Sequence, residues 1–173
     1  MIDPTPTPTP TPTPPSPDQQ VRHLRQANAV AAAALRSGQH PFGALLVGPD
    51  HETIWLSQGN VDAVNHAESV LAREAARRWT PAELWGCTLY TTVEPCAMCA
   101  GTQYWAHIGR VVYGMSETAL RAITGAHPDN PTLDLPCRSV FGSGQKPIQV
   151  IGPVPEVEAD IAALHQRFWQ SAG

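Results

Sequence analysis

A chain of 173 residues with 42% hydrophobic side chains is long enough to form one folded domain with a substantial core. Its net charge of −4 argues against a large phosphate-binding surface, and no apolar run reaches the roughly 18 residues that a membrane span needs. Four cysteines in a chain without a secretory signal indicate a reducing compartment, so we expect a cytoplasmic protein with no membrane association.

Residues 1–17 read MIDPTPTPTPTPTPPSP and differ in kind from the rest of the chain. A Thr-Pro repeat lacks every second backbone donor and has little apolar surface to bury, which is typical of an extended or disordered arm. We interpret residues 1–17 as such an arm, a solubilising tail in preference to a recognition segment. The folded domain is predicted to span residues 18–173.

The folded part is predicted to begin with a helix that Asp18 caps and Gly38 ends, because apolar residues recur between them at helical spacing. A hairpin follows, with strands at 43–47 and 53–56 joined by a turn at 48–51. The turn contains Gly, Pro and Asp, which are residue types that favour tight chain reversal.

The rest of the chain alternates between helical and strand-like patterns. Helices are predicted at 67–79, 96–106 and 157–170, strands at 87–93, 110–113 and 148–151, and an irregular stretch at 115–146 with a helical patch at 117–123. The last helix is expected to pack through Ile161, Leu164 and Phe168. This order of elements predicts an α/β fold in which helices cover both faces of one sheet.

Two short segments, HAE at 66–68 and PCAMC at 95–99, carry the residue types of a metal site, and each opens a predicted helix. Cys96 and Cys99 are three apart and share a helix face, where the positive field of the helix N-terminus favours their thiolate forms. The histidine adds an imidazole, and one imidazole with two thiolates suits tetrahedral Zn²⁺. Three protein ligands leave the fourth position open to water, as in catalytic zinc sites, and Glu68 can carry protons there.

The joint pattern His-x-Glu…Pro-Cys-x-x-Cys is the signature of zinc-dependent nucleobase deaminases, in which the glutamate moves protons and is not a ligand. We therefore predict a zinc-dependent hydrolase whose metal ligands are His66, Cys96 and Cys99. Glu68 is its predicted catalytic residue.

Other interpretations of these residues stay open. A redox Cys-x-x-Cys pair would leave the distant His-x-Glu unexplained. A structural zinc site would need a fourth ligand, which Cys87 or Cys137 could supply. A catalytically inactive, zinc-stabilised binding domain would have no need of Glu68, the one acid in the signature that is not a ligand.

With these motifs identified, the chain resembles the cytidine-deaminase-like superfamily across residues 20–170. The segments HPFGA at 40–44, GN at 59–60, HAE at 66–68, EPCAMC at 94–99 and YWA at 104–106 are similar to bacterial guanine deaminases, and IGRVVYG at 108–114 is closer to tRNA-specific adenosine deaminases. The resemblance implies a three-layer α-β-α fold with a five-stranded mixed sheet, one Zn²⁺, and a homodimer or larger oligomer.

The resemblance also assigns roles around the substrate. It implies that Asn60 hydrogen-bonds the base, that Phe42 stacks on its ring, that Trp105 walls the pocket and that the Ala67 amide helps to fix the ring edge. The residues allow simpler alternatives, because Phe42 and Trp105 could be core aromatics and Asn60 could be a turn residue.

The resemblance to these deaminases is weakest in the segment after the fourth strand, which bears on substrate specificity. Guanine deaminases of this type carry an acidic residue after the fourth strand, and Asp129 is only a candidate for it. The tRNA enzymes carry a glycine-rich, basic segment there, whereas this chain is acid-leaning. We therefore expect a free nucleobase or nucleoside as substrate, with guanine or guanosine favoured. Adenine-type, cytosine-type and triazine or pterin rings stay open, and a tRNA-specific adenosine deaminase is the alternative.

Overall fold

The computed structural model describes residues 13–125 and 127–171. The strands are β1 (Gly43–Val47), β2 (Ile54–Gly59), β3 (Thr88–Val93), β4 (Arg110–Met115) and β5 (Gln149–Ile151). The helices are α1 (Pro17–Arg36), α2 (Ala67–Arg78), α3 (Pro81–Trp85), α4 (Ala97–Trp105), α5 (Glu117–Thr124), α6 (Cys137–Gly142) and α7 (Pro155–Ser171). In the described part of the chain, no helix combines the length and apolarity that a bilayer span requires.

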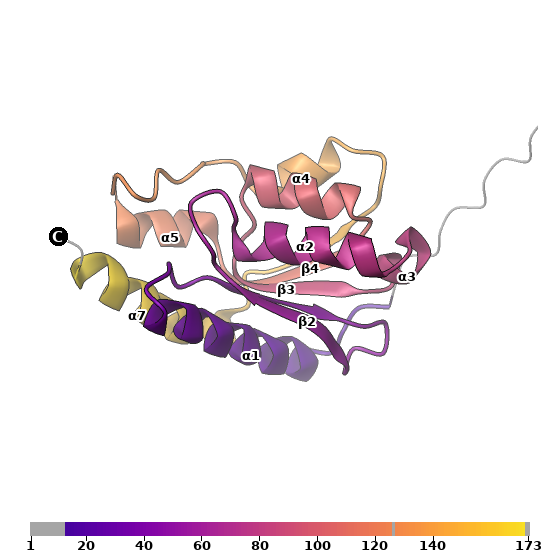
Figure 1. Ribbon diagram of the computed structural model, residues 1–173, viewed down its shortest axis with the longest axis horizontal. Helices are drawn as coiled ribbons and strands as arrows, with labels where there is room; N and C mark the ends of the chain where they lie inside the picture. The colour runs from indigo at the N-terminus through magenta and orange to yellow at the C-terminus, as the bar shows by residue number, and fades with distance from the viewer. Residues whose placement is uncertain (1–12, 126, 172–173) are drawn as a thin grey trace, which may run out of the picture.

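A mixed sheet in the order β2-β1-β3-β4-β5 separates two layers of helices (Figure 1). β1 is antiparallel to β2 and β3, whereas β3, β4 and β5 are parallel to one another. Helices α2, α4 and α6 cover one face, and α1 and α7 cover the other, with α5 packed beside α7. The predicted three-layer α/β fold with a five-stranded mixed sheet is confirmed.

The sheet is covered on both faces because its central strands are apolar on both sides. Leu89 and Val111 pack in the core under α2, while their neighbours Tyr90 and Val112 pack in the core under α1 and α7. Every residue of β1, β3 and β4 is buried. Side chains alternate between the faces of a strand, so a strand without exposed polar positions needs a helix layer on each side.

The cap of α1 corrects one detail of the sequence prediction. Ser16, and not Asp18, caps the helix, because the Ser16 side chain accepts from the Gln19 amide while the Gln19 side chain accepts from the Ser16 amide. Pro17 occupies the first turn, where its missing N–H has no helical partner to lose. The helix ends at Arg36, and Gly38 follows with a φ of +81°.

Two short helices, α3 and α6, were not predicted. In α7, the last helix of the chain, the predicted packing face is right at Ile161 and wrong at Leu164 and Phe168. Thr80 and Glu83 form a capping box that starts α3, so Pro81 opens a new helix as well as following α2. α6 lies inside the stretch predicted to be irregular. In α7 the buried residues are Val157, Ile161, His165 and Trp169, whereas Leu164 and Phe168 are only half-buried. The buried face follows a strict four-residue repeat and includes a histidine, which hydrophobicity alone does not reveal.

Residues 13–16, which precede α1 in the chain, contact the folded domain. The Thr13 carbonyl accepts a hydrogen bond of 2.7 Å from the guanidinium of Arg110, which is fully buried at the start of β4. Thr88 Oγ1 and Gln149 Oε1 accept two further hydrogen bonds from the same side chain. Pro15 is also buried. The remainder of the predicted arm, residues 1–12, lies outside the described residues.

Candidate active site

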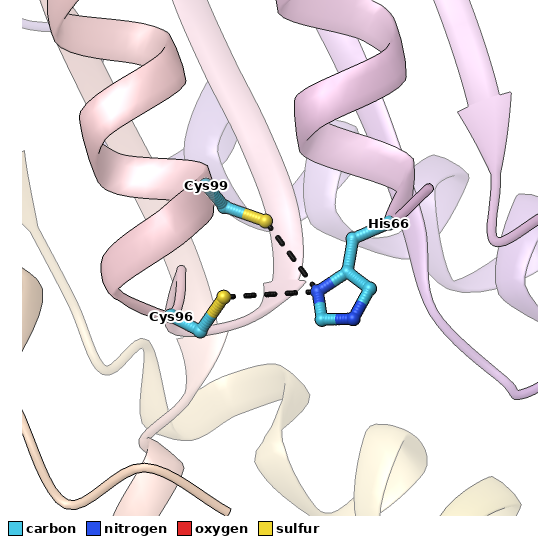
Figure 2. Close-up of side chains that lie close together, drawn as sticks. All are labelled: His66, Cys96 and Cys99. Atoms are coloured by element: carbon cyan, nitrogen blue, oxygen red, sulfur yellow. Dashed lines mark hydrogen bonds between the residues drawn. The ribbon is translucent and has the colours of Figure 1, made fainter. Parts of the chain in front are cut away.

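The three predicted metal ligands come together at two adjacent helix N-termini (Figure 2). His66 is the N-cap of α2 and Cys96 is the N-cap of α4, and these two helices pack against each other on one face of the sheet. Cys99 lies in the first turn of α4. His66 Nδ1 is 3.7 Å from Cys96 Sγ and 3.6 Å from Cys99 Sγ. Ideal zinc bond lengths at a tetrahedral angle place nitrogen and sulfur about 3.6 Å apart, so the spacing fits Zn²⁺.

The surroundings of His66 and Cys99 orient both side chains as metal ligands. His66 Nε2 lies 3.1 Å from the Ala63 carbonyl oxygen, which can only accept, so Nε2 carries the proton of the neutral ring. Nδ1 then presents its lone pair to the two sulfurs. The Ser69 hydroxyl donates to Cys99 Sγ over 3.2 Å, which favours a thiolate there. The donor set therefore fits zinc in its chemistry as well as in its spacing.

The two cysteines of the site share a proton, and the two outside it stay protonated. Hydrogen bonds from Cys99 and His66 lower the pKa of Cys96 to about 4, against the opposing effect of burial. Its hydrogen bond with Cys96, together with burial, raises the pKa of Cys99. Burial raises the pKa of Cys87 and of Cys137 to about 12. Within the described residues, His66, Cys96 and Cys99 form the only group of three or more candidate ligands close enough to share an ion. Neither Cys87 nor Cys137 completes a four-ligand structural site.

Glu68 reaches the same site from the first turn of α2. Two residues that are two apart in a regular helix point to different sides of it. His66 has extended backbone angles (φ −66°, ψ 152°) and lies outside the helix, so its side chain and that of Glu68 can face the same site. Only 5% of Glu68 is exposed, and Thr91 Oγ1 donates to its Oε1 over 2.8 Å. Its Oε2 lies 3.7 Å from Cys99 Sγ. Burial raises the pKa of Glu68, and a carboxyl group held at this place can serve as a general acid and base.

A cavity of about 520 Å³ opens in front of these residues. Phe42 and Asn60 line it together with His66, Glu68 and Cys96. The two residues predicted to contact the base are linked, because the backbone N–H of Asn60 donates a hydrogen bond to the backbone carbonyl of Phe42 over 3.0 Å. The structure thus brings Phe42 and Asn60 to the cavity, where their roles towards substrate stay predictions.

The other two predicted substrate contacts are placed differently. The Ala67 side chain is fully buried in the core, and its amide belongs to the first turn of α2, where backbone N–H groups have no helical acceptor. Trp105 does not wall the cavity, which corrects the expectation, because it is 76% exposed and lines a separate groove between α2 and α4. It lies nine residues beyond Cys96, about 13 Å along the helix, so α4 carries it away from the ligands.

Two acidic residues of the site were not predicted. Glu94 is 7% exposed and accepts from the Cys137 amide at the start of α6 and from the Glu117 amide at the start of α5. Glu117 itself lines the cavity, as do Glu94 and the suspected Asp129. Burial, with the negative charges of Cys96 and Glu68 as smaller causes, raises the pKa of Glu117 to about 8. Both acids stand immediately beside recognised signals, Glu94 before the Pro-Cys pair and Glu117 after the fourth strand.

An imidazole and two thiolates at paired helix N-termini, beside a buried carboxyl group and an open cavity, define a zinc-dependent hydrolase of the deaminase class. Residues 17–115 match the model of the cytidine and deoxycytidylate deaminase zinc-binding region. The chain belongs to this family. The predicted family, enzyme class and zinc cofactor are confirmed.

Relatives within the family differ in the substrates they are named for. The chain is 36% identical over 156 residues to a probable cytosine deaminase of Schizosaccharomyces pombe, covering 88% of this chain and 93% of the relative. It is 37% identical over 100 residues to a guanine deaminase of Bacillus subtilis, covering 55% of this chain and 64% of that enzyme. A solved structure from a study of tRNA:A34 deaminases is similar with a TM-score of 0.59 at 26% identity, covering 83% of this chain and 99% of that one.

Proposed function

We propose that this deaminase removes an exocyclic amine from a free nucleobase or nucleoside and releases ammonia. Guanine and cytosine are the bases that we expect it to act on first, because the similarity extends to a guanine deaminase and to a probable cytosine deaminase. Both bases carry the N=C–NH₂ unit that hydrolytic deamination attacks. The observation that carries the proposal is the composition of the cavity in front of the metal ligands.

That cavity is acidic. The carboxylate residues that line it are Asp62, Glu68, Glu94, Glu117 and Asp129, and no Lys or Arg from the described residues lines it. A phosphate group would meet repulsion here, whereas a neutral base would not. Proteins that hold RNA neutralise its phosphates with basic side chains. The cavity therefore favours an unphosphorylated small molecule over a nucleotide or a tRNA loop.

The residues of the chain divide the chemistry between them. Zn²⁺ held by His66, Cys96 and Cys99 would supply Lewis acidity and lower the pKa of a bound water molecule to roughly 7. The Glu68 carboxylate takes a proton from the attacking water and passes it to a ring nitrogen while the water oxygen bonds to the ring carbon. It then takes the second proton from that hydroxyl group and delivers it to the amine, so that the C–N bond breaks, a carbonyl group forms and ammonia leaves. Thr91 holds one Glu68 oxygen in place during these transfers. Asn60 hydrogen-bonds the base, and Phe42 packs against its ring.

Ammonia release from the zinc-loaded full chain tests the proposal directly. We expect turnover of at least one of guanine, guanosine, cytosine and cytidine, and no inosine formation in total tRNA. A mobility-shift assay with the same tRNA at moderate salt serves as the parallel measurement. Tight, salt-sensitive binding together with inosine formation would show a tRNA-specific adenosine deaminase instead.

We also propose that the chain forms a homodimer through the groove between α2 and α4. Trp105 stands 76% exposed beside this groove, whose walls include Ala72, Ala76 and Gly101. Tryptophan is enriched in the cores of protein–protein interfaces, and this indole, which contacts the Tyr104 ring, stands beside small residues that allow a partner to approach closely. Light scattering should give twice the mass of the chain, and Trp105→Ser should shift the mass towards the monomer. A monomeric wild-type protein at micromolar concentration contradicts this proposal.

A further inference from the structure

Glu117 is an acidic residue of the cavity that the proposed mechanism does not use. It opens α5 directly after β4 and lines the same cavity as Glu68, Asn60 and Cys96. Its side chain is partly buried, and the ionised residues that influence it most are Cys96, Glu68 and Glu94. Glu117 is therefore positioned to meet the bound substrate.

A role in helix capping does not account for this placement. Ser116 already caps α5, because its hydroxyl accepts from the Ala119 amide over 3.1 Å. An acid in the first turn can interact with the helix dipole equally well from solvent, without desolvation. Glu117 instead shares a cavity with other carboxyl groups, and its raised pKa reflects the unfavourable free energy of ionising there. A carboxyl group kept at such a position is a candidate for ligand contact.

Glu94 fixes where Glu117 stands relative to the metal ligands. Its Oε2 accepts from the Glu117 amide over 3.3 Å, and its Oε1 accepts from the Cys137 amide over 2.9 Å. Glu94 lies two residues before Cys96 on the same strand-to-helix connection. The backbone of Glu117 is thereby tied to the segment that carries the cysteine ligands. Such support from a neighbouring residue is what a preorganised substrate contact requires.

We propose that Glu117 accepts a hydrogen bond from the ring N–H that a free base carries where a nucleoside carries its sugar, and that it selects free bases in this way. The inference rests on the proposed function. Guanine and cytosine both have this N–H as free bases, whereas guanosine and cytidine lack it. A carboxyl group offers an acceptor oxygen whether or not it is ionised, and this oxygen pairs with the N–H but has nothing to pair with on a glycosylated nitrogen.

Kinetics of Glu117→Leu and Glu117→Gln on guanine, guanosine, cytosine and cytidine test this role. In the leucine variant we expect KM for the free bases to rise at least about tenfold while kcat changes by less than about threefold, since a hydrogen bond to the substrate is lost. The ratio of kcat/KM for base over nucleoside should fall about tenfold. Glutamine retains one acceptor oxygen and should show a smaller change in the same direction. Glu156→Leu, which removes an exposed glutamate from the first turn of α7, is the matched control.

Calorimetric binding of the same four compounds, together with zinc content, supplies a measurement independent of turnover. Full zinc occupancy with weaker binding of the bases supports the role. Unchanged binding and selectivity in Glu117→Leu overturns it, as does a larger loss for the nucleosides, which would make the carboxylate a reader of ribose hydroxyls. If wild-type protein turns over a base and the selectivity does not move, only this inference fails. If wild-type protein neither binds nor deaminates any of the four compounds, the proposed function fails and the inference falls with it.

Discussion

Glu68→Gln should leave zinc stoichiometric and reduce ammonia release at least about a hundredfold, which is the usual contribution of a positioned general acid and base. Glutamine has nearly the size of glutamate, and its side-chain oxygen can still accept the 2.8 Å hydrogen bond from Thr91. It cannot take up and return a proton at neutral pH. The variant therefore removes the chemistry while retaining the packing of a side chain that is only 5% exposed.

The measurement combines metal analysis with steady-state rates on whichever base the wild-type protein deaminates. Glu74→Gln is the matched control, because it changes the same residue type on α2 at a position whose ion pairs with Arg77 and Arg78 are solvent-exposed. Wild-type rates are expected for that control. Near-normal turnover by Glu68→Gln would refute the role assigned to Glu68. Loss of zinc in the same variant would make Glu68 a support of the metal site instead.

Cys96→Ala should lose zinc and stability together. The site joins the N-termini of α2 and α4, so metal bound there stabilises the folded state and not the unfolded one. With free zinc a thousandfold above its Kd, this linkage amounts to about 4 kcal/mol of unfolding free energy. His66→Ala should behave in the same way, since it removes the ligand from the other helix.

The cysteines outside the site provide the control for this prediction. Cys137→Ala removes a thiol that is fully buried and whose pKa is raised to about 12. It should keep its zinc and lose only about 1 kcal/mol of stability, the common value for a single substitution. Thermal unfolding with and without a chelator separates the two cases, because chelation should lower the Tm of the wild type and of Cys137→Ala but not that of Cys96→Ala. Full zinc occupancy in Cys96→Ala overturns the ligand assignment.

Metal ligands could be predicted from sequence because their geometry is local. Cys96 and Cys99 are brought to one face by the pitch of a single helix turn, and the extended backbone of His66 follows from its position at a helix start. The central strands were predictable for a similar reason, since runs such as Thr88–Val93 are apolar or β-branched on both faces. The ends of elements were less certain, as Ser16 in place of Asp18 shows, because neighbouring residues compete for the same cap.

The substrate side of the site depends on contacts between segments far apart in the chain. Trp105 is near the signature in sequence, yet the length of α4 carries it to the surface. Glu94 and Glu117 belong to no spacing pattern that indicates a shared site. Their relation appears only in the folded chain, where Glu94 accepts hydrogen bonds from the backbone amides of Glu117 at the start of α5 and Cys137 at the start of α6. His165 belongs to the buried face of α7 although its residue type is polar.

The sequence by itself was enough to predict the deaminase family, the candidate zinc ligands and the α/β fold. Each half of the His-x-Glu…Pro-Cys-x-x-Cys signature is a short-range pattern at one helix start, and the order of helical and strand-like patterns indicates the fold. The tertiary structure alone decided which acids line the cavity, which aromatic residue faces solvent and how the two helix N-termini meet. Those properties depend on contacts formed when the sheet brings distant segments together, and short-range periodicity contains no record of such contacts.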